Sequence, residues 1–313
     1  MRACCLGVFI GLCAVSLMVG ARPLQWAQLA AGDASAWLTL TASRLPRLAA
    51  LVLIGAGLAV CGVILQHVVR NKFVEPATSG GLDAAKLGIL VAMILAPGAG
   101  SAGRMLLALL FCFGASALFV AIVQRIRLRN SVLVPVIGLM YGSVLSALAE
   151  FYAYRHNILQ SMQGWLLGDF SRVVQGNYEI VYLTLPVVLA SYLFAQRFTV
   201  LGMGEGIASG LGLNYVGTVT AGLMLVAVTV AVSVITVGAI PFVGLVIPNL
   251  VALRYGDNLQ RTLPIVALGG AALLLLCDIL GRLIIYPFEV PIGLTAGSLG
   301  GVLLLALIVW RHR

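Results

Sequence analysis

The feature that most constrains this chain is a series of ten long apolar stretches with few polar residues between them. They lie at about residues 3–21, 48–69, 81–97, 104–124, 132–150, 180–196, 219–238, 240–253, 263–281 and 291–310. A helix needs about 20 apolar residues to cross the hydrocarbon core of a bilayer. Because helices satisfy their own backbone groups in lipid, this pattern predicts an all-α polytopic membrane protein with about ten transmembrane helices.

The composition supports the same fold class. Hydrophobic residues make up 61% of the chain and charged residues only 9%, against about 25% charged residues in soluble domains. This excludes a soluble enzyme, a nucleic-acid-binding module and a disordered chain. We therefore expect one transmembrane domain over residues 1–313. The N-terminal run resembles a secretory signal, but further spans follow it, so we expect an uncleaved first helix. The short run at 240–253, which starts with Pro241, predicts a partial or kinked span.

In a membrane protein, the net charge of +9 is first interpreted as evidence about which loops face the cytoplasm. Lys and Arg accumulate in cytoplasmic loops, and an even number of spans places both termini on one side. With cytoplasmic termini, the inner side would carry eleven basic residues and the outer side seven. The inner set is Arg2, Arg70, Lys72, Arg125, Arg127, Arg129, Arg197, Arg254, Arg261, Arg311 and Arg313; the outer set is Arg22, Arg44, Arg47, Arg104, Arg155, Arg172 and Arg282. The bias favours N and C termini in the cytoplasm.

No catalytic constellation is present. The chain has no Walker A loop, no Gly-x-Ser-x-Gly elbow and no His-Glu-x-x-His motif. Its six cysteines and three histidines lack metal-ligand spacing. We expect no catalytic residue, no metal site and no cofactor bound by this chain, and a membrane-embedded enzyme is a remote alternative.

The acidic residues in the spans bear on a second alternative, a proton-driven secondary transporter. Such a transporter needs a titratable group in its pathway, and the candidates are Asp83, Glu150 and Asp278. Asp83 is three residues from Lys86, and Asp278 is four residues from Arg282, spacings at which helical side chains meet. Structural pairing is therefore favoured over a proton relay, although the alternative stays open.

Three polar segments stand out against the apolar background. Residues 44–47, Arg-Leu-Pro-Arg, predict a rigid, exposed basic corner before the second helix. Residues 70–76 with 79–81 predict a cytoplasmic turn. Residues 201–214, rich in glycine, predict a short amphiphilic helix on the inner membrane face, which a peripheral partner could grip. A fourth stretch, 157–170, predicts a short interfacial helix.

Motifs follow one another in order along nearly the whole chain. They are Arg44-Leu45-Pro46-Arg47; Leu65-Gln66; Arg70-Asn71-Lys72-Phe73-Val74-Glu75-Pro76; Gly204-Glu205 with Ala208, Leu211 and Gly212; Phe242-Val243-Gly244-Leu245-Val246-Ile247-Pro248-Asn249; and Glu289, Pro291 and Gly293. Together they resemble the FecCD family of ABC importer permeases, which serve iron-siderophores, haem and vitamin B12. The resemblance implies the vitamin-B12-permease-like fold of type II importers.

The resemblance also implies partners and site residues. The chain would pair with a second permease subunit, identical or paralogous, in the bacterial inner membrane. A periplasmic substrate-binding protein would deliver the ligand, and a cytoplasmic ABC ATPase would bind the ATP and Mg. The implied docking residues for the binding protein are Arg44, Arg47 and Arg282. The implied ATPase-coupling residues, within the loop 198–218, are Gly204, Glu205, Ala208, Leu211, Gly212 and Leu213. The implied gate and pore residues are Gln66, Asn130, Ser131 and Asn249.

Two positions depart from the family pattern. Asn249 stands where the family usually has His, and Lys72 stands where the turn usually has its first Pro. Asn249, followed by Gly256-Asp257-Asn258, resembles the branch that handles catecholate or mixed-ligand ferric siderophores of the vibriobactin, anguibactin and petrobactin types. The implied function is import of a ferric siderophore, with haem or vitamin B12 as alternative cargoes.

Overall fold

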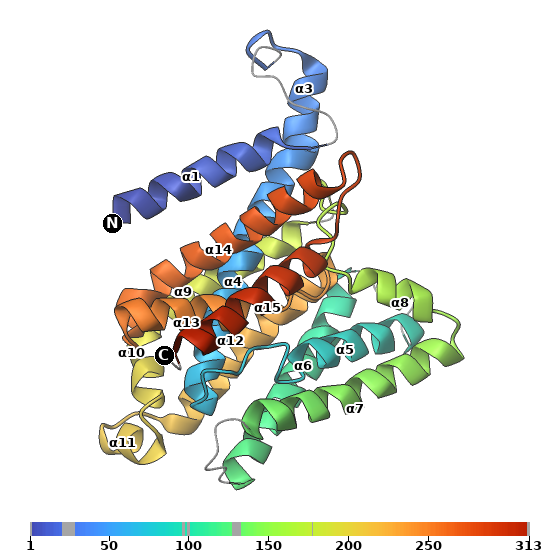
Figure 1. The fold of residues 1–313 in the computed structure, drawn as a ribbon. Helices are drawn as coiled ribbons and strands as arrows, with labels where there is room; N and C mark the ends of the chain where they lie inside the picture. Colours follow the sequence, from blue (N-terminus) through green and yellow to red (C-terminus); the bar gives the residue numbers. More distant parts are fainter. Residues whose placement is uncertain are drawn as a thin grey trace.

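The described part of the chain is helical throughout. The computed structural model describes residues 2–20, 29–95, 98, 101–126, 133–176 and 178–311, and these residues contain no strand. Figure 1 shows the arrangement of the helices. Their bounds are α1 (Arg2–Met18), α3 (Ala34–Thr39), η1 (Leu40–Arg44), α4 (Leu45–Val69), α5 (Gly81–Leu95), α6 (Ser101–Ile126), α7 (Leu133–Arg155), α8 (Leu159–Trp165), η2 (Glu179–Leu183), α9 (Thr184–Leu193), α10 (Ala195–Leu201), α11 (Glu205–Gly210), α12 (Tyr215–Thr236), α13 (Val243–Tyr255), α14 (Leu259–Ile284) and α15 (Ile292–Arg311).

A helix occupies each of the ten predicted apolar stretches. Among the described residues, five helices are long and apolar enough to cross a membrane by themselves, and α9 with α10 forms a sixth candidate bent by 62°. Three shorter apolar helices lie at Gly7–Met18, Val243–Tyr255 and Ile292–Leu307. The 13 residues of α13 span about 20 Å, which is too short to cross the bilayer. The partial span predicted at 240–253 is therefore confirmed.

α4 is the central helix of the bundle. Figure 1 shows it running among α9, α12, α13 and α14. Within the continuous helix Ala34–Val69, 72% of an apolar stretch of 18 residues is buried inside the protein. Glycines allow this close packing. A Cβ added at Gly55 would lie 2.6 Å from the Gly270 carbonyl oxygen of α14, and one added at Gly62 would overlap the Gly244 carbonyl of α13. The backbones of α4, α13 and α14 therefore touch.

Helices α5 to α8 form the other side of the molecule (Figure 1). They surround a smaller cluster of buried residues, namely Leu87, Leu90, Ala149, Ala153 and Met162. In α7, only 22% of the apolar stretch of 18 residues is buried. The helix exposes large apolar side chains such as Met140, which is 66% exposed, and Val144, which is 60% exposed. The helix predicted within 157–170 is α8.

The exposed basic corner predicted at residues 44–47 is wrong. Helical structure is continuous from Ala34 to Val69, with a π-helical turn at Leu40–Arg44. Arg44 and Pro46 are buried. Proline cannot donate the backbone hydrogen bond that the carbonyl four residues earlier would accept. Here the Gln175 N–H donates to that Ala42 carbonyl instead, at 3.0 Å, so the helix passes through the proline.

The glycine contacts around α4 lead to a stability prediction. We expect Gly62→Ala to lower the free energy of unfolding by about 1–3 kcal/mol, because the added methyl group would overlap the Gly244 carbonyl. The measurement is the thermal unfolding of the purified protein in detergent. Gly11→Ala in α1 is the control, since nothing lies within 4 Å of a Cβ there. Equal melting temperatures for the two variants would contradict this account of the packing.

Candidate functional site

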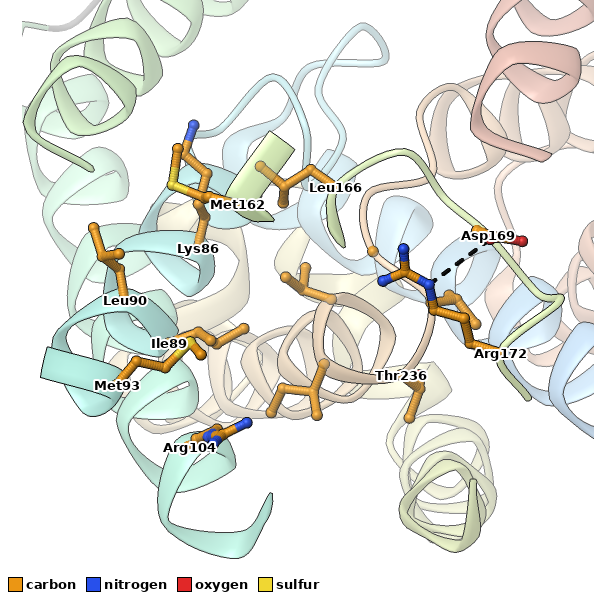
Figure 2. A pocket seen from close by; sticks show the side chains of 14 residues that line it. Lys86, Ile89, Leu90, Met93, Arg104, Met162, Leu166, Asp169, Arg172 and Thr236 are labelled. Atoms are coloured by element: carbon orange, nitrogen blue, oxygen red, sulfur yellow. Dashed lines mark ion pairs between the residues drawn. The ribbon is translucent and has the colours of Figure 1, made fainter. Parts of the chain in front are cut away.

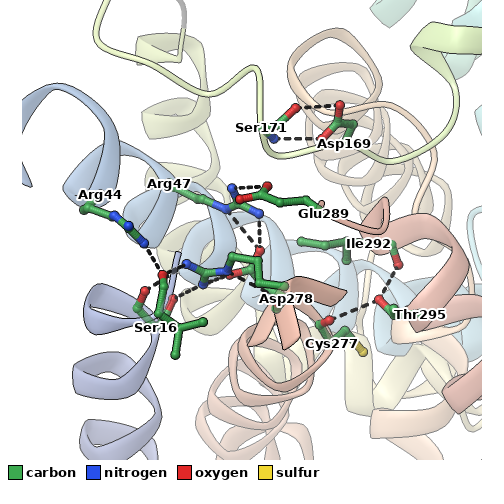
Figure 3. Close-up of polar contacts among 12 residues, drawn as sticks. Ser16, Arg44, Arg47, Asp169, Ser171, Cys277, Asp278, Glu289, Ile292 and Thr295 are labelled. Carbon is green, nitrogen blue, oxygen red and sulfur yellow. Dashed lines mark hydrogen bonds and ion pairs between the residues drawn. The ribbon is translucent and has the colours of Figure 1, made fainter. Parts of the chain in front are cut away.

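A cluster of charged side chains joins α1, α4 and α14 at one end of the bundle. Figure 3 shows Arg47 between two carboxylates. Its Nε and Nη2 donate to Oδ1 of Asp278 at 3.0 and 2.7 Å, and its Nη1 donates to Oε2 of Glu289 at 2.7 Å. The Asp278 side chain is fully buried, whereas Glu289 is 28% exposed. Arg47 thus neutralises a carboxylate that could not lie unpaired in the interior.

Arg282 completes the cluster from within α14. It pairs with the Oδ2 atom of Asp278, which confirms the pairing predicted from their spacing. Its guanidinium also donates to the carbonyl oxygen of Ser16 at 3.0 Å and to the Ser16 hydroxyl at 2.9 Å. Arg44 and Arg282 both donate to the Val19 carbonyl. The last carbonyls of α1 thus receive two cations, the favourable charge for a helix C-terminus.

The structure therefore brings the three predicted docking arginines together, but it directs them towards the chain's own groups. Arg282 is 3% exposed and Arg44 9%, while the Arg47 side chain is 13% exposed. Arg47 and Glu289 lie at the rim of the cluster, and Arg282 lies inside it. The Arg47–Glu289 pair joins residues 242 positions apart, so sequence spacing offered no signal for it.

The predicted amphiphilic helix within residues 201–214 is α11. Gly204 precedes it with φ +104° and Gly212 follows it with φ +78°, conformations that favour glycine. Ala208 is fully buried, whereas Glu205 is exposed. Leu213 is half-buried, and its N–H closes the loop on the Ala208 carbonyl at 3.0 Å. Asn214 caps α12 by accepting from the Gly217 N–H at 2.9 Å.

α11 presents an apolar surface to its surroundings. Met203 and Ile207 are each 56% exposed, and Leu211 is 67% exposed. Such neighbouring apolar side chains are typical of a protein interaction surface. α12 leads away from α11 over 22 residues, about 33 Å. Figure 1 places α11 at the opposite end of the molecule from α3, whose helix leads into the arginine cluster.

The two departures from the family pattern touch each other near α11. The Asn249 amide donates to the Lys72 carbonyl at 2.8 Å and to the Leu245 carbonyl at 2.7 Å. The Lys72 ammonium pairs with Asp257, between α13 and α14. Gln66 is 3% exposed and donates to the Gly244 carbonyl at 3.4 Å. The predicted pore residue Gln66 therefore joins α4 to α13, and Asn249 fastens the 70–76 turn to α13.

Glu75 was not among the predicted site residues. Its side chain is buried at 3% exposure, and its Oε1 accepts from the Phe242 N–H at 3.0 Å, at the start of α13. A carboxylate is favourable there because helix N-termini carry unsatisfied N–H groups and a partial positive charge. Its place in the 70–76 motif gave no sign of a role, since its partner lies 167 positions away.

The remaining candidates are placed as follows. Asn130 and Ser131 lie outside the described residues. Lys86 is buried and donates to the Ser146 hydroxyl at 2.6 Å. Its ammonium also lies 3.8 Å from Asp83 and 3.7 Å from Glu150, so the predicted Asp83–Lys86 pair is confirmed. Across the described residues, no group of three or more His, Cys, Asp or Glu side chains could hold a metal ion.

The chain is similar to siderophore permeases along almost its whole length. It is 62% identical over 301 residues to the ferric-anguibactin transport system permease protein FatD of Vibrio anguillarum, covering 96% of both chains. It is 42% identical over 307 residues to the petrobactin import system permease protein YclN of Bacillus subtilis, covering 97% of this chain and 96% of that one.

A solved structure and a family profile agree with these relatives. The solved structure is an inward-facing metal-chelate type ABC transporter, with a TM-score of 0.78, 27% identity and 97% of each chain covered. The profile of the FecCD transport family matches residues 8–310. The sequence, the helical architecture and these matches coincide over the same residues. The chain therefore belongs to the FecCD transport family, and its fold is that of the ABC transporter permeases.

Proposed function

We propose that this chain is the permease subunit of an ABC importer that moves a ferric siderophore, of the catecholate-containing class, into the cytoplasm. The observation that carries the proposal is the α11 loop, which exposes Ile207 and Leu211 at the opposite end of the bundle from the arginine cluster. A permease that is driven by a separate ATPase needs such a surface. The cargo is inferred from relatives that carry ferric anguibactin and petrobactin.

The charged side chains in the spans favour this function over a proton-driven transporter. Asp278 is engaged by two arginines, and Asp83 and Glu150 both lie beside Lys86. Each of these carboxylates already has a cationic partner within the chain, so structural pairing accounts for its place in the spans. A proton relay needs a group in the pathway that is not committed to such a pair.

The proposed partners follow from the exposed surfaces. An ATPase would dock at α11, where Glu205 and the apolar side chains are accessible. A second permease subunit would cover the apolar face of α7, which exposes Met140 and Val144. A periplasmic binding protein would dock beside the arginine cluster, with Arg47 and Glu289 at its rim. This assignment places both termini in the cytoplasm and the chain in the inner membrane.

The proposed cargo does not require the permease to supply metal ligands. A siderophore encloses its iron before it arrives, so the pathway needs shape and electrostatics rather than metal ligands. ATP and Mg would be bound by the partner ATPase.

Uptake of radio-iron tests the function directly. Cells that lack this gene would receive it back and be given a ferric catecholate siderophore. We expect restored uptake that persists with a protonophore while cellular ATP is maintained. Uptake that collapses with the protonophore under these conditions would favour a proton-driven transporter. Restored uptake of haem or vitamin B12 alone would overturn the cargo.

A charge reversal in α11 tests coupling. We expect Glu205→Arg to reduce uptake by at least about tenfold at normal membrane levels, because a cation replaces the exposed carboxylate at the proposed ATPase contact. ATP hydrolysis by the assembled complex, measured with and without the binding protein, would lose its response to the ligand. Glu179→Arg, an exposed acidic residue at the start of the segment leading into α9, is the control. Normal uptake by Glu205→Arg would refute the coupling role.

A second charge reversal tests the other end of the bundle. Arg47→Glu would face Asp278 and Glu289 with a third carboxylate, so we expect both lower thermal stability and slower uptake. Arg47→Lys keeps the charge but loses the guanidinium fork that reaches both carboxylates. Its thermal stability and uptake should lie between those of the wild type and those of Arg47→Glu. Wild-type melting temperature and wild-type binding-protein affinity in Arg47→Glu would contradict both the cluster and the docking assignment.

The contact between Lys72 and Asn249 predicts coupled effects. Lys72→Pro and Asn249→His each install the usual family residue. Because the Asn249 amide binds the Lys72 carbonyl, we expect the two changes in unfolding free energy to be non-additive by about 0.5–3 kcal/mol. The measurement is a double-mutant cycle on thermal or denaturant unfolding. Additive effects would mean that the two departures are independent.

A further inference from the structure

A cavity of about 180 Å³ lies between α5, α6, α8 and the end of α12. Figure 2 shows the lining side chains. Its wall is mostly apolar, with Ile89, Leu90, Met93, Met162 and Leu166 among the lining residues. Three cations also contribute, Lys86, Arg104 and Arg172, against one carboxylate, Asp169. A largely apolar cavity with a few charged groups is the usual composition of a small-molecule site.

Two of the charged residues are already engaged. The Lys86 ammonium donates to Ser146 and lies near Asp83 and Glu150, so its charge is balanced outside the cavity. Asp169 accepts from the Ser171 N–H and hydroxyl at 2.8 and 2.7 Å. Figure 2 shows the Asp169 carboxylate joined to Arg172 by a dashed line that marks their ion pair.

Arg172 stands at the mouth of the cavity. Its Nε lies 3.8 Å from Asp169 Oδ2, and its side chain is 55% exposed. Figure 2 shows its terminal nitrogens on the side that faces the other lining residues. A guanidinium held at Nε retains four further N–H donors, so Arg172 can meet an anion that enters the cavity.

Arg104 is the cation whose charge is left unbalanced. Its Nε is buried and has no hydrogen-bond partner, and within the described ranges no carboxylate forms an ion pair with it. Buried donors are normally satisfied. The fork of a guanidinium matches paired anionic oxygens. Arg104 can therefore pair with an oxyanion that enters the cavity, because no carboxylate of the described residues forms an ion pair with it.

The volume and the lining define the rest of the ligand. An apolar cavity of about 150 Å³ can hold benzene, so about 180 Å³ suits one substituted aromatic ring. Sulfur atoms such as those of Met93 and Met162 make favourable contacts with ring edges. A whole metal chelate exceeds this space, but one arm of it would fit.

We propose that this cavity binds a single aromatic ring that carries anionic oxygens, a catecholate or salicylate arm of the cargo, with Arg104 as its main charge partner. This inference rests on the proposed function. The cavity touches the end of α12 at Val237 and Gly238, about 33 Å along that helix from α11. It therefore lies on the side from which an imported ligand arrives. The site would favour aryl-bearing chelates.

Backbone hydrogen bonds fix the 166–172 segment, which forms one wall of the cavity. The Asp169 N–H donates to the Val237 carbonyl at 2.8 Å, and the Gly293 N–H donates to the Gly168 carbonyl at 3.1 Å. These bonds hold the 166–172 segment against the end of α12 and the start of α15. Arg172 is consequently kept beside the cavity.

The test measures binding of radiolabelled 2,3-dihydroxybenzoate by equilibrium dialysis. The full-length permease, assembled with its partner subunits, would be placed in phosphatidylcholine nanodiscs. We expect saturable binding that weakens about tenfold or more in Arg104→Gln. Ile89→Trp, which retains Arg104 but fills the cavity, should lose the binding as well. Arg125→Gln, at the other end of α6, is the matched control and should bind as the wild type does.

Three results would overturn the site. One is equal binding by Arg104→Gln and wild type at equal thermal stability. Another is equal binding of benzyl alcohol, a neutral ring, because the oxyanion would then be irrelevant. The third is displacement of the probe when phosphatidylglycerol replaces phosphatidylcholine, which would assign the cavity to anionic lipid.

An uptake arm separates this site from the proposed function. Ferric iron would be offered to cells as a tris-catecholate and as a trihydroxamate without aromatic rings. The site would be supported if wild-type cells take up the tris-catecholate in preference to the trihydroxamate and Arg104→Gln loses only the uptake of the tris-catecholate. Uptake of neither chelate by wild type, combined with Arg104-dependent binding of 2,3-dihydroxybenzoate, would refute the import function and leave the site standing. Catecholate uptake unaffected by Arg104→Gln would overturn the site and leave the import function standing.

Discussion

The direct contact of the α4 backbone with α13 and α14 is the constraint on which the rest of the structure depends. Gly55 meets Gly270, and Gly62 meets Gly244. In a bilayer, helices gain little from burying apolar surface against one another, so close packing and polar contacts must hold them. Because α4 lies this close to α14, Arg47 reaches Asp278 at one end. Because it lies this close to α13, Gln66 reaches the Gly244 carbonyl near the other.

The polar contacts therefore depend on the glycine contacts and also fix their register. A slip of α4 along α14 by one turn, about 5.4 Å, would separate Arg47 from Asp278 and leave a fully buried carboxylate with one partner fewer. Breaking a buried ion pair in this way is strongly destabilising. Small residues set how near the helices come, and paired charges set how they align. Both ends of α4 are held, so it behaves as a rigid link between the arginine cluster and the 70–76 turn.

The sequence predicted the helices well because hydropathy reports directly on the solvent around a span. It also predicted contacts between neighbours on one helix, such as Asp278 with Arg282, since helical spacing decides them. It failed at residues 44–47, where a proline and two arginines suggested an exposed corner. The Gln175 N–H that compensates Pro46 lies 133 positions away from the Ala42 carbonyl that it satisfies, and no local pattern reveals such a partner.

The candidate site shows the same limit, because local sequence patterns do not reveal partners that are distant in the chain. The glycine-rich segment 201–214 predicted the short helix α11, because backbone conformation is a local property. The roles of Glu75 and Glu289 arise only when distant segments meet, at Phe242 and Arg47. The contact between Lys72 and Asn249 belongs to this class as well, although each residue by itself departs from the family pattern in the sequence. Residues were thus identified more readily than their partners.

A cavity for one arm of a chelate is a physically reasonable way to select cargo during transport. A pathway must bind its cargo strongly enough to admit it and weakly enough to release it. A site that enclosed the whole chelate would hold it, whereas one ring and one guanidinium contribute only a modest part of the binding free energy. Arg104 also stands among apolar walls, where its interaction with an oxyanion is stronger than in water. Selection by one arm therefore reconciles discrimination among chelates with passage through the membrane.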